Sequence, residues 1–115
     1  MDVDITERTF DFATRIVQLC QVLDENPGTP RTLANQLLRS GTSIGANVEE
    51  AQAAQSKPDF ISKLSISCKE ARETLYWLRL LIATGIMPET KLVSLKNEAN
   101  ELVAILTTII KNSRA

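Results

Sequence analysis

The sequence predicts an all-α protein, an antiparallel up-down-up-down four-helix bundle in a single domain over residues 1–115. Three observations lead to this prediction. Apolar residues recur at spacings of three and four along almost the whole chain, which is the period of an α-helix. Aromatic residues make up only 4% of the chain, so aliphatic residues fill the core, and that composition favours helices over strands. Breakers divide the pattern into four segments with short connections, which place neighbouring helices antiparallel.

The first helix is expected over about residues 6–25, with Thr6 or Asp4 as its N-terminal cap. The run Asn26-Pro27-Gly28 ends it. Its apolar residues form two adjacent stripes: Phe12, Ile16, Leu19 and Leu23, with Phe10, Ala13, Val17 and Cys20 beside them. So wide an apolar face suggests an oligomer interface, although a broad core explains it equally well.

A second helix is expected over about residues 30–55, with Thr29 as N-cap and Pro30 in its first turn. The apolar seam of this helix includes small residues such as Gly41 and Ala51. Its members are Leu33, Leu37, Gly41, Ile44, Val48 and Ala51. Each mid-helix glycine costs about 1 kcal/mol relative to alanine, which is tolerable where another helix must approach closely. The alternative is a break at Ser40-Gly41 that gives two short helices.

The third and fourth helices are expected over about residues 58–84 and 88–112. Ser56 caps the third helix ahead of Pro58, and Gly85 ends it. Its inner face is predicted to contain Phe60 or Ile61, Leu64, Cys68, Ala71, Leu75, Leu78 and Ile82. The fourth helix follows Pro88 and carries a heptad seam: Leu92, Leu95, Ala99, Leu102, Leu106 and Ile109. Lys111 and Arg114 suit the negative end of its helix dipole.

The residue types that most catalytic and metal centres need are missing from the sequence. The chain contains no histidine, which excludes Ser–His and Cys–His nucleophiles and the Glu/His di-iron sites of helical bundles. Cys20 and Cys68 are not at a metal-ligand spacing and are expected to be reduced and buried. We therefore expect no enzymatic activity, no cofactor and no metal; an unfamiliar carboxylate site is the remaining enzymatic alternative.

A formal net charge of −1 means that any nucleic-acid surface must be a local basic patch. The candidate patch consists of Lys69, Arg72, Tyr76 and Arg79 on the third helix, extended by Arg31 and Arg39 from the second. The spacing of three and four on the third helix places its four members in one stripe, where Tyr76 can stack on a base while the cations hold phosphates. The alternative is that Glu70 and Glu73 pair with these cations and that Tyr76 and Trp77 pack in an interface.

Two runs of sequence carry a resemblance to a known family: LLRSGTSIGANVEEA, and then DFISKLSISCKEARETLYWLRLLIATGI. The pattern Arg-Ser-x-x-Ser-Ile-x-x-Asn starts at Arg39, Phe-x-x-x-Leu-x-Ile starts at Phe60, and a Gly-Ile turn lies at Gly85. With these motifs, about residues 6–112 resemble the bacterial four-helix-bundle or 23S rRNA-intervening-sequence proteins.

The resemblance implies that antiparallel four-helix bundles assemble as a homopentameric ring. Some members of the family are encoded inside insertions in large-subunit ribosomal RNA genes. The family is also similar to the accessory variability determinant of diversity-generating retroelements, a basic pentamer that binds nucleic acid and a reverse transcriptase.

From the residues and the resemblance together we expect a non-enzymatic homo-oligomeric scaffold. It would bind RNA or DNA, or a nucleic-acid-handling protein such as a reverse transcriptase, through a repeated basic patch. The alternative is a protein-interaction module with no direct nucleic-acid binding. No signal peptide and no span of about 18 apolar residues is present, so we expect a cytoplasmic protein that does not insert into membranes.

Overall fold

The computed structural model describes residues 4–115, and they form four helices joined by short turns. The helices are α1 (Ile5–Leu23), α2 (Thr29–Gln52), α3 (Lys57–Ala83) and α4 (Glu89–Arg114). Within the described residues there is no strand, which confirms the all-α prediction with four helices. None of these helices, over residues 4–115, is both long and apolar enough to cross a membrane.

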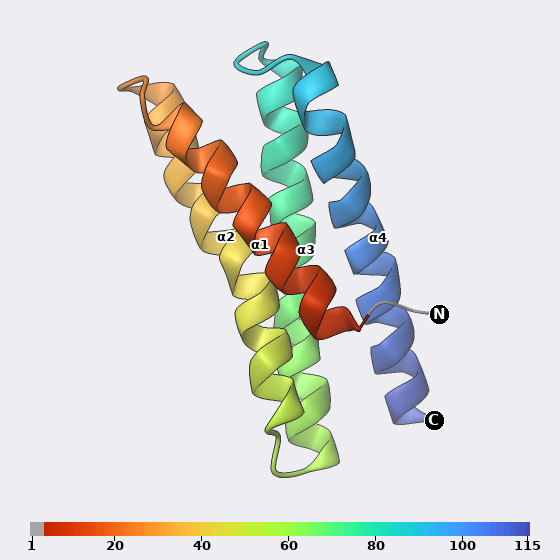
Figure 1. The fold of residues 1–115 in the computed structure, drawn as a ribbon. Helices are drawn as coiled ribbons and strands as arrows, with labels where there is room; N and C mark the ends of the chain where they lie inside the picture. The colour runs from red at the N-terminus through yellow and green to blue at the C-terminus, as the bar shows by residue number, and fades with distance from the viewer. Residues whose placement is uncertain (1–3) are drawn as a thin grey trace.

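The helices pack mainly on their neighbours in the sequence. α2 packs along both α1 and α3, and α3 packs along α4, whereas α1 and α4 touch over a much shorter stretch. The α2–α3 connection lies at one end of the molecule, and the other two connections lie at the opposite end (Figure 1). The N-terminal half of α1 crosses toward α4, where Arg8 donates to both carboxylate oxygens of Glu98 at 3.0 and 2.6 Å.

Side-chain caps explain where α1 and α3 begin, whereas α2 and α4 have no such bond. The Asp4 side chain accepts from the backbone N–H of Thr6, and the Ser56 hydroxyl accepts from that of Asp59, each at 3.2 Å. The prediction of Thr29 as the N-cap of α2 is wrong: Thr29 is the first helical residue, because Gly28, with a φ of 91°, makes the turn before it. At the C-terminal ends the sequence was less informative: α1 stops at Leu23 rather than 25, and α2 stops at Gln52 rather than 55. α2 runs unbroken through Ser40-Gly41, so the alternative of two short helices is wrong.

The two glycines of α2 allow α1 to approach closely. A Cβ atom at Gly41 would lie 2.7 Å from Cγ2 of Ile16, and one at Gly45 would lie 3.2 Å from the backbone oxygen of Thr9. Real Cβ atoms do not come that near at Gly41, so the α1–α2 packing depends on the missing side chain. The small-residue seam predicted for this helix therefore has a defined partner.

The core contains most of the predicted seam residues and leaves part of the α1 surface uncovered. On α3, Leu81 is fully buried whereas the predicted Ile82 is only partly buried; on α4, Ile110 is buried and Ile109 is partly buried. The second apolar stripe of α1 divides: Cys20 is buried, but Phe10 is 67% exposed and Val17 is also exposed. A broad core within one chain therefore does not account for the whole stripe.

Candidate nucleic-acid interface

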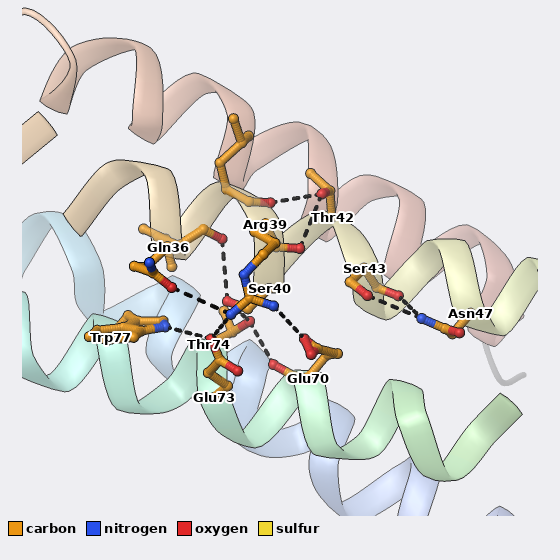
Figure 2. A network of polar contacts seen from close by, with 12 residues as sticks. Gln36, Arg39, Ser40, Thr42, Ser43, Asn47, Glu70, Glu73, Thr74 and Trp77 are labelled. Atoms are coloured by element: carbon orange, nitrogen blue, oxygen red, sulfur yellow. Dashed lines mark hydrogen bonds and ion pairs between the residues drawn. The ribbon is translucent and has the colours of Figure 1, made fainter. Parts of the chain in front are cut away.

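Arg39 lies on α2, where its guanidinium faces two acidic residues of α3 (Figure 2). It forms an ion pair with Glu73, and its Nη1 atom is 3.5 Å from Oε2 of Glu70. Glu73 also accepts a hydrogen bond from Nε1 of Trp77 at 3.1 Å. Glu70 is only 8% exposed, and its Oε2 atom has no hydrogen-bond partner among the described residues. Arg39 therefore compensates a buried carboxylate and joins α2 to α3.

The hydroxyl and amide side chains near Arg39 are hydrogen-bonded, either across the α2–α3 contact or within α2. The hydroxyl of Thr74 lies 2.9 Å from that of Ser40 and 2.8 Å from the backbone oxygen of Glu70. On the same helix as Arg39, Nδ2 of Asn47 donates to the backbone oxygen and the hydroxyl of Ser43 at 2.9 and 3.1 Å (Figure 2). These bonds give Ser40, Ser43 and Asn47 structural partners within the chain.

Arg31 is engaged at the turn between α1 and α2. Its Nε and Nη2 atoms donate to the backbone oxygen of Asp24 at 3.1 and 2.8 Å, and Nε is 3.2 Å from the Asp24 carboxylate. A cation at this position satisfies an orphan carbonyl at the C-terminal end of α1. The structure does not unite Arg31 and Arg39 with the α3 stripe, because Arg31 pairs with Asp24 and Arg39 pairs with the two acids of α3 that face α2.

The α3 stripe itself is on the surface. Lys69, Arg72, Tyr76 and Arg79 are all exposed, and none of the three cations forms an ion pair with any residue in 4–115. Tyr76 is 54% exposed and packs edge-on against Trp77, with ring centroids 5.1 Å apart. Glu70 and Glu73, the acids interleaved with the stripe in sequence, face Arg39 on α2 instead. Pairing within α3 therefore does not neutralise this stripe.

The α4 helix adds cations that our sequence reasoning did not place here. Arg72 lines a hollow of about 340 Å³ together with Lys111 and Arg114 near the end of α4. The stripe of α4 that contains these two residues follows spacings of three and four: Lys96, Asn100, Val103, Thr107, Lys111 and Arg114. That spacing was visible in the sequence, but only the packing of α4 on α3 shows that the stripe borders Arg72.

The two stripes meet where Arg72 lies beside Lys111 and Arg114, and we call them together the basic face. Its six cations are Lys69, Arg72 and Arg79 of α3 and Lys96, Lys111 and Arg114 of α4. None of the six takes part in an ion pair within residues 4–115, and neither stripe contains an acidic residue. The α4 stripe is about 27 Å long at 1.5 Å per residue. An overall net charge of −1 is therefore compatible with a local excess of positive charge along these two stripes.

Both the sequence and the fold match known proteins. A family model described as 23S rRNA-intervening sequence protein matches residues 1–108. The crystal structure of a protein of unknown function from the S23 ribosomal protein family of Bacteroides thetaiotaomicron has a TM-score of 0.87 to this chain. The two are 44% identical, and the match covers 94% of this chain and 99% of the other. No curated protein matches the chain.

Proposed function

This chain belongs to the 23S rRNA-intervening sequence protein family, and we propose that it is a non-enzymatic homo-oligomeric scaffold that binds RNA or DNA through the basic face. One observation carries the proposal: six cations lie on two stripes that meet at Arg72, Lys111 and Arg114, with no acid among them and no ion pair within residues 4–115. Contacts from Lys and Arg to phosphates supply most of non-specific nucleic-acid affinity. Tyr76, exposed between Arg72 and Arg79, offers a ring on which a base can stack.

The oligomer in this proposal is a pentameric ring of antiparallel up-down-up-down bundles, in which subunits meet through α1 and α2. Exposed apolar side chains on these helices support that choice, since Phe10, Val17 and Leu38 are all solvent-accessible in the single chain. The basic face lies on the other pair of helices, so contacts through α1 and α2 leave it open in every copy. Repetition then turns several weak phosphate contacts into useful avidity.

The test is binding of a structured RNA and of duplex DNA, measured by fluorescence polarisation across a salt series. Each phosphate contact contributes about −0.7 to −0.9 to the slope of log K against log salt. The triple variant Lys69→Gln/Arg72→Gln/Arg79→Gln should therefore flatten the slope by about 2 to 3 and leave the mass of the assembly unchanged.

The matched control removes three cations outside the basic face. Lys57, Lys63 and Lys91 lie elsewhere on α3 and α4, and the triple Gln variant at these positions makes the same change in net charge. This control variant should have the same slope of log K against log salt as the parent. Equal losses in the two triple variants would mean that only total charge matters, and no binding by the parent at low salt would overturn the proposal.

A second candidate is a protein-interaction module without direct nucleic-acid binding. The observation that favours it is again the α1–α2 surface, where Phe10 and Leu38 expose apolar area of the kind that accepts a partner helix. Pull-down with and without nuclease separates the two proposals. A partner that is retained after nuclease treatment and lost in Phe10→Ser/Leu38→Ser supports this candidate.

A further inference from the structure

The hollow between α3 and α4 combines an apolar floor with a positively charged rim. Cys68 is 4% exposed and Ile110 is also buried, and both line its floor. The rim carries Arg72, Lys111 and Arg114. These are the only charged residues that line the hollow, and within residues 4–115 none of the three has an ion-pair partner.

The hydroxyl groups of the hollow do not offer protons to a ligand. Oγ1 of Thr107 donates to the backbone oxygen of Val103 at 2.7 Å, and Oγ of Ser65 donates to that of Ile61 at 2.7 Å. A bare inorganic anion placed on the floor would therefore lose water without gaining donors there. An apolar group placed on the same floor would instead be favoured by its removal from water.

We propose that this hollow binds a small amphipathic anion, namely an alkyl or acyl chain of medium length with a carboxylate or phosphate head. The alkyl or acyl chain of the ligand would lie over Cys68 and Ile110, and its head group would contact Arg72 and the two cations of α4. A volume of about 340 Å³ falls within the range of small-molecule sites. An arginine at the rim suits either head group, because its guanidinium can bond two oxygens at once.

This inference does not depend on nucleic-acid binding. Arg72, Lys111 and Arg114 belong to both the basic face and the hollow, but the floor residues Cys68 and Ile110 belong to the hollow alone. If the protein does not bind the amphipathic anion but binds nucleic acid with the expected dependence of log K on log salt, only the ligand site is overturned. If the protein binds the amphipathic anion but does not bind nucleic acid, the proposed function is overturned and the ligand site is not.

The first experiment is calorimetric titration of the full chain with butanoate, hexanoate and octanoate, below the concentrations at which they form micelles. Burial of each added methylene should raise affinity about fourfold until the hollow is full. Octan-1-ol, which has no charge, and inorganic phosphate, which has no chain, should each bind at least tenfold more weakly than octanoate. Equal affinity across the acids would overturn the proposal, as would binding only to anionic phospholipid vesicles and not to the monomeric acids.

Two neighbouring threonines of α4 supply a matched pair of variants. Thr107 lines the hollow, whereas Thr108 does not and bonds its own helix in the same way, donating to the backbone oxygen of Ala104 at 3.0 Å. Thr107→Trp should fill the hollow and weaken octanoate binding by tenfold or more, and Thr108→Trp should leave it unchanged. Equal affinities in the two variants would place the ligand elsewhere.

The thiol on the floor provides a readout that needs no change in the hollow itself. In a Cys20→Ala background Cys68 is the remaining cysteine, so a small neutral thiol reagent such as methyl methanethiosulfonate reports on it alone. Saturating octanoate should slow modification of Cys68 at least fivefold, and octan-1-ol at the same concentration should not. If saturating octanoate leaves the rate of Cys68 modification unchanged, the alkyl chain of the ligand does not cover the floor of the hollow.

Discussion

Nη1 of Arg39 on α2 lies 3.5 Å from Oε2 of Glu70 on α3, and Glu70 is the one buried acid among residues 4–115. The same guanidinium reaches Glu73, so a single exposed cation serves two carboxylates of the neighbouring helix. A carboxylate removed from water is costly unless it is paired. The arginine that the sequence offered as a phosphate ligand is thus placed to stabilise the α2–α3 contact.

Replacing Arg39 with methionine should lower the free energy of unfolding by about 1–3 kcal/mol, because the buried Glu70 loses its compensating charge. The Arg39 side chain is 55% exposed, so the loss should lie well below that of a fully buried pair. Urea denaturation of the parent and the variant measures this change in the free energy of unfolding. Arg79→Met, at an exposed arginine with no ion pair in residues 4–115, is the control and should stay within about 0.5 kcal/mol of the parent.

Adding Glu70→Gln to Arg39→Met should recover part of that loss, since the neutral amide no longer carries an unpaired buried charge. If Arg39→Met unfolds at the same urea concentration as the parent, Glu70 does not depend on the guanidinium. The stabilising role assigned to Arg39 would then be wrong.

Gly41→Ala should destabilise the protein although alanine is the better helix former. The propensity gain is about 1 kcal/mol, but the new Cβ would lie 2.7 Å from Cγ2 of Ile16, and overpacking of this kind costs about 1–3 kcal/mol. Thermal unfolding should therefore show a lower Tm. Because the clash is with one side chain, Ile16→Ala should cost less in the Gly41→Ala background than in the parent. Additive effects would mean that the two residues do not contact as described.

The sequence predicted the starts of α1 and α3 well because the signals that begin these helices are local. Asp4 and Ser56 cap residues two or three positions away, and the breakers lie between the apolar segments. The C-terminal end of α2 had no such signal, and its predicted bound at 55 was three residues too late. The sequence predicted Ile82 on the inner face of α3, but Leu81 is the buried residue, because burial here depends on where α2 and α4 lie around the helix.

The candidate site was predictable only in part, because free and paired cations look alike in a sequence. Arg39 is neutralised by Glu73, which is 34 positions away, and Arg31 by Asp24 across a turn. The α3 stripe could be read from its spacing alone. Lys111 looked like a helix-end charge until the packing of α4 on α3 set it beside Arg72. Surface charge patterns that involve two helices therefore require the fold.

Alkaline pH should destabilise the folded chain through Cys20. Burial, with a smaller contribution from Asp24, raises the pKa of its thiol from 9.0 to about 11. Between these values the unfolded chain has lost the thiol proton and the folded chain still holds it, so stability falls as pH rises, by about 2 kcal/mol at pH 11. Denaturation at pH 8 to 11 should show a smaller decline in Cys20→Ala. Parallel declines in the two proteins would exclude the thiol as the cause.

Lys96 tests how far the basic face extends along α4. It lies on the same stripe as Lys111, but about 22 Å away along the helix at 1.5 Å per residue. If nucleic acid follows the whole face, Lys96→Gln should reduce the slope of log K against log salt by about 0.7 to 0.9. Lys91→Gln removes the same charge from a different side of α4 and should leave the slope unchanged. If Lys96→Gln keeps the parent's slope of log K against log salt and Lys111→Gln has a smaller one, the phosphate contacts are confined to the end of α4 near the hollow.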